Sequence, residues 1–444
     1  MAPLSVPAGT ARAIVAVPVS KTSEPRPAHG PAASYLTASE RLAEATGLAK
    51  AIGLDVRFAG TVPLTQMRPA TLFGSGKVEE IGALVGTEEA AVVIVDHALT
   101  PIQQRNLEKA WNAKVLDRTG LILEIFAGRA HSKAGRLQVE LARLTYQKSR
   151  LVRSWTHLER QRGGFGFLGG PGETQIEADR RAIGERIDSI RGELSVVERT
   201  RRLHRKRRQL AQRQTVALVG YTNAGKSSLF NAFTGAGVLA QDMLFATLDP
   251  TLRRVEFPQG GAFILSDTVG FVSELPPQLI AAFHSTLEEI LEASLILHVR
   301  DIASAATEAQ RIEVERVLAE IGIDKQEQAK RVIEVWNKAD LLTSEEHERL
   351  SRLASQGRHR AVLVSAQTGG GLGELAALVR DLLQKQTCTR SVVVDGGNGP
   401  LIHWLYENTE IVGREDRHDG SLRFEVRVAS ERENDLDRHL RRTA

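Results

Sequence analysis

Residues 215–233 of this 444-residue chain read TVALVGYTNAGKSSLFNAF, and they decide the fold of the region around them. An apolar, β-branched run leads into a loop with the spacing GxxxxGKS, residues 220–227, and the loop opens directly into a helical pattern. A glycine loop between a strand and a helix is typical of phosphate-binding loops. The stretch therefore predicts an α/β domain with a mostly parallel sheet, which we place at residues 214–385.

The loop has the residue types that bind a nucleoside triphosphate together with Mg²⁺. Its glycines let backbone N–H groups converge on the β-phosphate at the start of the helix. We expect Lys226 to bridge the β- and γ-phosphates as a catalytic residue, and Ser227 to bind Mg²⁺. The positions of this loop predicted to contact the nucleotide are Gly220, Tyr221, Thr222, Asn223, Ala224, Gly225, Lys226, Ser227 and Ser228.

A second motif predicts that the base is guanine. Residues 332–340, VIEVWNKAD, are a β-rich run that ends in Asn337-Lys338-x-Asp340. The carboxylate of Asp340 can accept hydrogen bonds from both N1–H and N2–H₂ of guanine, a pair of donors that adenine lacks. We expect Asn337 and Lys338 to brace the loop and to cover the base.

Three further segments complete the set of motifs expected for a GTP site. Ser365 and Ala366 follow another strand pattern, in AVLVSA, where a backbone N–H can reach guanine O6. Asp267 and Gly270 form a DxxG motif, in which the carboxylate holds Mg²⁺ through water and the glycine N–H contacts the γ-phosphate as a catalytic group. Thr247, in LFATLDPT, is expected to be a second Mg²⁺ ligand and a catalytic residue. In this order the motifs predict a Ras-like P-loop GTPase domain that hydrolyses GTP to GDP and phosphate.

The net charge of +4 conceals one strongly basic segment. Residues 136–213 contain 19 Lys and Arg against 9 Asp and Glu, so the rest of the chain is acidic. Such a block favours contact with a polyanion over a merely solvated helix face. Its densest part is residues 201–213, and the positions expected to bind a partner there are Arg201, Arg202, Arg205, Lys206, Arg207 and Arg208.

Two apolar repeats in the same segment predict an antiparallel coiled-coil helical hairpin over residues 135–213. Repeats with a 4-3 spacing on either side of a short loop can bury each other only if the chain folds back. The tip loop, residues 161–172, carries Phe165 and Phe167, which suits entry into a crevice of a partner better than a merely tolerated surface loop. The repeat positions are Leu137, Leu141, Leu144, Leu151, Trp155 and Leu158, then Ile176, Ile183, Ile187, Ile190, Leu194 and Val197.

The two ends of the chain carry further regions. We expect a disordered extension at residues 1–11, an N-terminal α/β layer domain at 12–134 and a small C-terminal α+β domain at 386–444. Residues 73–81, FGSGKVEEI, indicate a glycine-rich turn that opens a helix, with a second nucleotide or RNA-phosphate site near Lys77 as the alternative. The strands expected in the first domain are residues 13–17, 91–95 and 114–117, and the helices are 39–53 and 100–111.

Composition excludes some classes of protein. The single cysteine, Cys388, rules out a disulfide within the chain and fits a reducing compartment. No apolar run approaches the roughly 18 residues that a membrane-spanning helix needs. We therefore expect a cytoplasmic protein, and a monomer.

Taken together, the motifs resemble those of the translational GTPases of the Obg–HflX group, and within it the HflX family. The resemblance implies a GTPase that binds the large (50S) ribosomal subunit and splits stalled or idle 70S ribosomes under stress. It also implies that the hairpin tip reaches the peptidyl-transferase centre, where Phe165 and Phe167 would contact rRNA bases. The stretches that carry it are GSGKVEEI, QQRNLE, VLDRTGLILEIF, LQVELARL, GGPGETQIEADRR, GYTNAGKSSLFN, LFATLDPT and DTVGFV.

Two residues bear on the rate of hydrolysis. Phe271 follows the DxxG glycine, at the place where Ras-like enzymes have a glutamine that orients the attacking water. Because phenylalanine cannot make that hydrogen bond, we expect slow intrinsic hydrolysis and stimulation by ribosomal particles. Asn223 suggests K⁺ as an activating ion, since several GTPases with asparagine at this loop position use one.

Two other functions remain open from the sequence. One is a GTP-regulated 50S-binding or assembly factor that does not split ribosomes. The other is a nucleotide-dependent rRNA-remodelling enzyme that uses the second site near Lys77.

Overall fold

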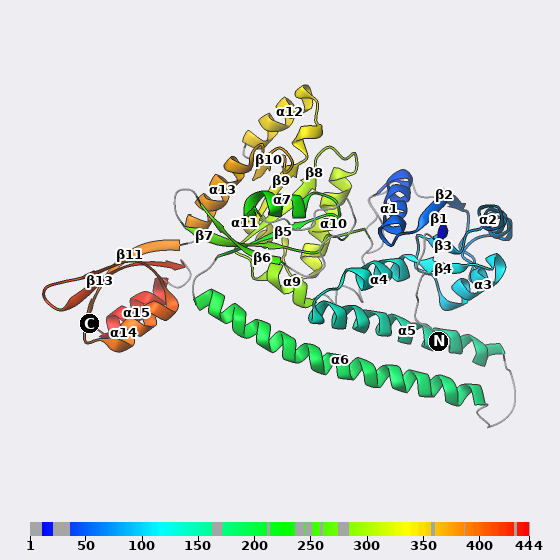
Figure 1. The fold of residues 1–444 in the computed structure, drawn as a ribbon, viewed down its shortest axis with the longest axis horizontal. Coiled ribbons are helices and arrows are strands. Elements are labelled where there is room, and N and C mark those ends of the chain that lie inside the picture. The colour runs from blue at the N-terminus through cyan, green and yellow to red at the C-terminus, as the bar shows by residue number, and fades with distance from the viewer. Residues whose placement is uncertain are drawn as a thin grey trace.

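Three β-sheets and a pair of long helices make up the protein (Figure 1). The computed structural model describes residues 11–20, 36–161, 171–210, 214–235, 245, 251–257, 261–273, 284–356, 360–385, 387–429 and 433–443. The N-terminal and C-terminal sheets lie at opposite ends, with the central sheet between them (Figure 1). The expected extension at residues 1–11 falls outside the described residues except for Ala11, and the domain limits stay predictions.

The N-terminal sheet has four parallel strands in the order β2-β1-β3-β4. The expected strands and helices of this region are confirmed, and α2 opens directly after Gly74 as expected. One further strand, β2, was not predicted, because this edge strand contains Gly60 and Pro63, two residue types that are uncommon inside strands, and only Val62 and Leu64 of it are buried. The elements are β1 (Arg12–Ser20), α1 (Ala38–Ala51), β2 (Asp55–Leu64), α2 (Ser75–Glu88), β3 (Val92–Val95), α3 (Pro101–Trp111), β4 (Lys114–Asp117) and α4 (Arg118–Arg129).

Side-chain caps fix where the helices of this layer begin. Thr37 and Thr100 form capping boxes with the residues three positions later, at the starts of α1 and α3. Asp117 is the last residue of β4 and accepts from the Gly120 N–H, 2.8 Å away, as the cap of α4. Because strand and helix meet at this residue, Arg118 lies at the carboxyl edge of the sheet.

The helices α5 (Lys133–Gln161) and α6 (Pro171–Leu210) run antiparallel along one side of the molecule (Figure 1). Their direction follows from two ion pairs: Arg186 with Glu140 at 2.9 Å, and Lys133 with Glu193 at 4.0 Å. The seam between them is apolar, as the repeats predicted. Its residues are Leu137, Ile190 and Leu194, with Leu141 and Leu144 packed against them.

One face of α5 docks on the N-terminal layer, so the first helix does not project freely as a bare arm. Val139 and Ala142 are buried in the same apolar cluster as Phe126 of α4. The Tyr146 hydroxyl donates to Asp117 Oδ1 at 2.6 Å, and Arg150 Nη2 donates to Asp117 Oδ2 at 3.0 Å. The heptad pattern could not predict this packing, because it reports only the stripe that faces the partner helix.

The central sheet has six strands in the order β10-β9-β8-β5-β7-β6, all parallel except β6. Helices cover both faces: Phe230 and Val379 are buried on one face, and Ile290 and Val317 on the other. The expected Ras-like α/β fold with a mostly parallel sheet is confirmed. Its strands are β5 (Thr215–Gly220), β6 (Thr251–Glu256), β7 (Ala262–Asp267), β8 (Leu295–Asp301), β9 (Val332–Asn337) and β10 (Ala361–Leu363). Its helices are α7 (Lys226–Thr234), α9 (His284–Leu291), α10 (Thr307–Glu320), α11 (Lys325–Arg331), η1 (Ala339–Leu341), α12 (Ser344–Ser355) and α13 (Leu372–Lys385).

The C-terminal sheet is antiparallel, in the order β11-β13-β12, as expected for a small α+β unit. The turn at Asp419-Gly420 joins β12 to β13, and Gly420 adopts φ 82°, which glycine tolerates best. Cys388, in β11, is a free thiol. The elements are β11 (Thr387–Asp395), α14 (Gly399–Asn408), β12 (Glu410–Asp416), β13 (Ser421–Ala429) and α15 (Glu433–Thr443).

Within the described part of the chain, every helix is too short or too polar to cross a membrane.

Candidate functional site

The glycine loop joins the end of β5 to the start of α7, as its spacing predicted. Two glycines are required there by close packing. A Cβ on Gly220 would lie 2.2 Å from the Val299 carbonyl oxygen, and a Cβ on Gly225 would lie 2.1 Å from Asn337 Nδ2. Gly225 also adopts φ 91° at the helix N-terminus. The loop therefore packs directly against β8 and against the first residue of the guanine motif.

Lys226 is buried at the start of α7. Its Nζ donates a hydrogen bond to the Tyr221 carbonyl, 2.8 Å away, across the loop. Burial lowers the pKa of Lys226 to about 8, although the carboxylate of Asp267 acts in the opposite direction. An anion with several negative charges, bound at this place, would stabilise the charged ammonium.

The hydroxyl of Ser227 and the carboxylate of Asp267 come together at the carboxyl edge of the central sheet. Ser227 Oγ donates to Asp267 Oδ2 at 2.8 Å, and Asp267 is fully buried at the end of β7. A hydroxyl and a carboxylate are the hard oxygen donors that Mg²⁺ prefers, so the residues present fit the ion. The described residues contain no cluster of three His, Cys, Asp or Glu residues that would indicate a different kind of metal site.

Asn337 ties the guanine motif to the glycine loop. Its Nδ2 donates to the Ala224 carbonyl at 2.9 Å, and its Oδ1 accepts from the Ala366 N–H at 3.0 Å. One side chain therefore links three loops that lie far apart in the sequence. The predicted bracing role has a concrete geometry here: Asn337 sets the spacing between the loop expected for the phosphates and the two loops expected for the base.

The other residues expected around the base lie beside Asn337, at the same edge of the central sheet. Ser365 Oγ donates to Asp340 Oδ1 at 2.5 Å, and Lys338 Nζ pairs with Asp301 at 2.8 Å. The backbone N–H of Ser365 donates to the Gly370 carbonyl, while that of Ala366 is used by Asn337. The contact expected with guanine O6 would have to share one of these N–H groups. The sequence did not reveal that both groups already have acceptors within the protein.

The DxxG segment, residues 267–270, lies against the glycine loop. A Cβ on Gly270 would be 2.9 Å from Thr222 Cγ2 and 3.0 Å from Lys226 Nζ. The Phe271 N–H donates to the Gly220 carbonyl at 3.1 Å, and the Thr222 N–H donates to the Phe271 carbonyl at 2.7 Å. The Phe271 side chain is buried in the apolar cluster that this domain shares with the N-terminal layer.

Several predicted residues cannot be placed. Thr247, Phe165 and Phe167 lie outside the described residues. The six basic positions expected to bind a partner, Arg201 to Arg208, fall within the last ten residues of α6. Asn223 and Ser228 lie in the loop and in the first turn of α7, as expected, and Asn223 adopts φ 60°.

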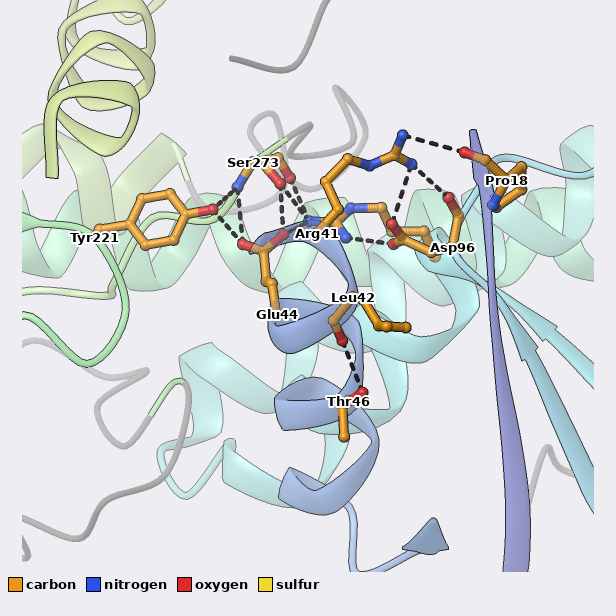
Figure 2. A network of polar contacts seen from close by, with 9 residues as sticks. Pro18, Arg41, Leu42, Glu44, Thr46, Asp96, Tyr221 and Ser273 are labelled. Atoms are coloured by element: carbon orange, nitrogen blue, oxygen red, sulfur yellow. Dashed lines mark hydrogen bonds and ion pairs between the residues drawn. The ribbon is translucent and has the colours of Figure 1, made fainter. Parts of the chain in front are cut away.

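Sequence reasoning missed one group of residues beside the site. Tyr221 was expected to contact the nucleotide through its place in the loop, but its hydroxyl points to the N-terminal layer and donates to Glu44 (Figure 2). Ser273, three residues after Gly270, bonds to Tyr221, Glu44 and Arg118. Glu44 and Tyr221 are 177 positions apart, so no local pattern could have found this contact.

Comparisons with known proteins agree with this geometry. Family models match residues 39–127 (GTP-binding GTPase N-terminal), 129–208 (GTP-binding GTPase Middle Region), 215–338 (50S ribosome-binding GTPase) and 351–444 (HflX C-terminal domain). The chain is 51% identical over 371 residues to a GTPase HflX of Magnetococcus marinus, covering 84% of each chain.

A second relative, a GTPase HflX of Escherichia coli, is 43% identical over 389 residues, which cover 88% of this chain and 90% of the relative. Among solved structures, a complex titled SsGBP with GDP aligns with 84% of this chain and 99% of its own, at 23% identity and a TM-score of 0.47. The family models and the relatives together show that the chain belongs to the HflX family of GTPases.

Proposed function

We propose that this GTPase binds the large ribosomal subunit and uses GTP to separate the two subunits of 70S ribosomes in the cytoplasm. The observation that carries the proposal is the joining of a basic helix to the GTP site. The helix α6, which ends at Leu210 and holds six clustered Arg and Lys positions, leads within five residues to β5, whose last residue opens the glycine loop. The match of residues 215–338 to a 50S ribosome-binding GTPase model supports a ribosomal partner.

The roles proposed for the site residues follow their placement. Lys226 and the Gly270 N–H would contact the γ-phosphate, and Asp340 would select guanine, with Asn337, Lys338, Ser365 and Ala366 around the base. Ser227 would bind Mg²⁺ and Asp267 would hold it through water; the ion would neutralise the charge that builds up on the β- and γ-phosphates. Thr247 stays a proposed second ligand and catalytic residue. The residues proposed to bind the nucleotide phosphates are Gly220 to Ser228, as the sequence predicted.

The buried Phe271 supports slow hydrolysis without a partner. Its ring lies in an apolar cluster and has no group that could orient the attacking water. We propose that ribosome binding supplies or admits that group. GTP turnover should therefore rise well above the basal rate when 50S or 70S particles are added. An unchanged rate across a ribosome titration would count decisively against a ribosomal partner.

Activation by K⁺ is a separate proposal, motivated by Asn223 in the glycine loop. A monovalent cation there would neutralise charge between the phosphates during hydrolysis. We expect faster turnover in K⁺ than in Na⁺ at equal ionic strength. Equal rates in the two salts would dispose of it.

Light scattering on 70S particles tests the splitting activity itself. We expect the scattering to fall when the protein and GTP are added, and expect the Phe165→Ala/Phe167→Ala variant to weaken the fall. Phe58→Ala is the matched control, because Phe58 is an exposed phenylalanine on the N-terminal sheet, 41% accessible. Binding to 50S in sucrose gradients without any loss of 70S scattering would favour the alternative, a GTP-regulated 50S-binding factor that does not split.

The second nucleotide site near Lys77 gains no support from the structure. Lys77 is partly exposed on the first turn of α2 and pairs with Glu80 at 2.5 Å, within the same helix. This arrangement agrees with the simpler interpretation of a glycine-rich turn. ATP turnover that survives Lys226→Ala and disappears in Lys77→Ala would reverse this conclusion.

A further inference from the structure

A buried polar network crosses from the N-terminal layer to the GTP site (Figure 2). Glu44, on α1, accepts from the Tyr221 hydroxyl and from Ser273 Oγ, the latter at 2.6 Å. The Tyr221 oxygen in turn accepts from the Ser273 N–H at 2.7 Å. Tyr221 belongs to the glycine loop and Ser273 follows the DxxG segment, so one carboxylate of another domain contacts both.

Arg118 completes the network from the other side. Its Nη2 donates to Glu44 Oε2 at 2.7 Å, and to both the carbonyl and the Oγ of Ser273 at 2.8 Å. Its Nη1 pairs with Asp96, which also accepts from Arg41 at 3.1 Å. The side chains of Arg118 and Glu44 are 5% and 7% exposed. Solvent therefore screens these interactions only weakly.

The network keeps the Tyr221 hydroxyl protonated and the Arg118 guanidinium charged. Burial and the neighbouring Glu44 carboxylate raise the pKa of Tyr221, so the phenol keeps its proton and remains a donor to that carboxylate. Burial opposes the charge of Arg118, but Glu44 and Asp96 outweigh it and raise the pKa of that guanidinium. Leaving any one partner buried without its bonds would be costly, so the members are expected to move together.

The segment between Gly270 and Ser273 is held at its start by the glycine loop, and at its end by Tyr221 together with residues of the N-terminal layer. At its start, Gly270 lies against Thr222 and Lys226, and both backbone groups of Phe271 bond to the glycine loop. At its end, Ser273 is held by Glu44, Tyr221 and Arg118. A γ-phosphate that contacts both Lys226 and the Gly270 N–H has to enter between them, which moves this segment and its last residue.

We infer that Glu44 is a positioning residue of the GTPase: through Tyr221 and Ser273 it holds the segment 270–273 against the glycine loop, and it thereby lowers the affinity for GTP relative to GDP. The N-terminal layer thus sets which nucleotide the site prefers. The inference concerns the isolated protein and does not depend on the proposed ribosomal function.

Affinities for GDP and for a non-hydrolysable GTP analogue, measured for the full chain, test the inference. In Tyr221→Phe and in Glu44→Gln, the ratio of the analogue affinity to the GDP affinity should rise by about fivefold or more, the lower end of coupling effects between sites. The double variant should show no more than the larger single effect, because both residues act through the same contact. An unchanged ratio, or a ratio that falls, would overturn the inference.

Tyr146→Phe is the matched control. It removes the same kind of bond, a partly buried tyrosine hydroxyl donating to a carboxylate, here Asp117 at 2.6 Å. Among the contacts of the described residues, those of Asp117 and Arg150 do not include the segment 270–273. Thermal unfolding of all variants separates nucleotide preference from folding. If Glu44→Gln does not fold, the ratio in Tyr221→Phe decides, because that change deletes a single oxygen. An equal rise of the ratio in Tyr146→Phe would show a general loosening and also overturn the inference.

Discussion

The central sheet carries the glycine loop at one edge and faces the N-terminal layer with another surface. The residues of these two regions are brought together in different ways. At the glycine loop, a strand, a turn and a helix follow one another within residues 215–234, and the guanine motif adds its residues at the same sheet edge. At the interdomain face, Glu44, Arg118 and Ser273 meet from three distant segments, and their partners follow no repeat or spacing. The residues expected for nucleotide chemistry are therefore set by local sequence, whereas the control that we propose for Glu44 depends on contacts that only the folded chain creates.

The largest effect should come from Lys226→Ala, which tests the local half of this comparison. Loss of the ammonium removes charge stabilisation at the γ-phosphate, so GTP turnover should fall by about 10²–10³-fold. Phosphate release under single-turnover conditions measures it. The control is Lys114→Ala, since Lys114 in β4 is another lysine whose pKa burial lowers, far from the glycine loop in sequence. Similar losses in both variants would contradict a local cause.

Asp340→Asn should change the preferred base from guanine to xanthine, and its effect should be somewhat smaller than that of Lys226→Ala. The amide presents a donor where guanine N2–H₂ needs an acceptor, so GTP affinity should fall by about 100-fold, the loss of two hydrogen bonds to a charged acceptor. Xanthosine triphosphate carries an oxygen at that position and should bind better than GTP. Competition binding of the two nucleotides gives the ratio, and a uniform loss for both would speak against base contact by Asp340.

Gly225→Ala should have a moderate effect on nucleotide affinity. Its Cβ would collide with Asn337 Nδ2 and break the bond from Asn337 to the Ala224 carbonyl, so affinity should fall by about tenfold. Gly235→Ala is the matched control, because Gly235 also has positive φ, 63°, but nothing lies within 4 Å of its Cβ. That change should cost only about 1 kcal/mol of stability from backbone strain, with nucleotide affinity unchanged. Isothermal calorimetry and thermal unfolding distinguish the two.

Phe126→Leu should have the smallest effect and probes the interdomain face. Phe126 of α4 meets Phe245 of the central domain edge to face, with ring centroids 4.6 Å apart and planes at 74°. Loss of this aromatic pair should lower the free energy of unfolding by about 1 kcal/mol. Nucleotide affinity measured by calorimetry should stay within twofold, because Phe126 belongs to α4 and is part of neither the glycine loop nor the guanine motif. A tenfold loss of affinity would contradict the separation of the interdomain face from the glycine loop.

The sequence predicted which candidate residues lie together where one motif, or one strand end, holds several of them. Gly225 and Asn337 illustrate this: each is recognised from its own motif, and the parallel strands β5 and β9 then bring both to one edge of the sheet. The edge strand β2 was missed because Gly60 and Pro63 argue against a strand when the sequence is considered alone. The docking of α5 was missed because a heptad stripe accounts for one face of a helix and is silent about the others.

By itself the sequence determined a Ras-like GTPase with a guanine site, an antiparallel helix pair beside it and membership of one family of GTPases. Those features rest on short-range spacing, and spacing sets which backbone groups a loop presents to a phosphate or a base. Only the tertiary structure decided that Tyr221 turns to Glu44 and that Ser273 is held by Arg118. The physical reason is that a buried charged group needs a partner, and the partner can come from any segment that the fold places beside it. A local sequence pattern does not show which distant segments become neighbours.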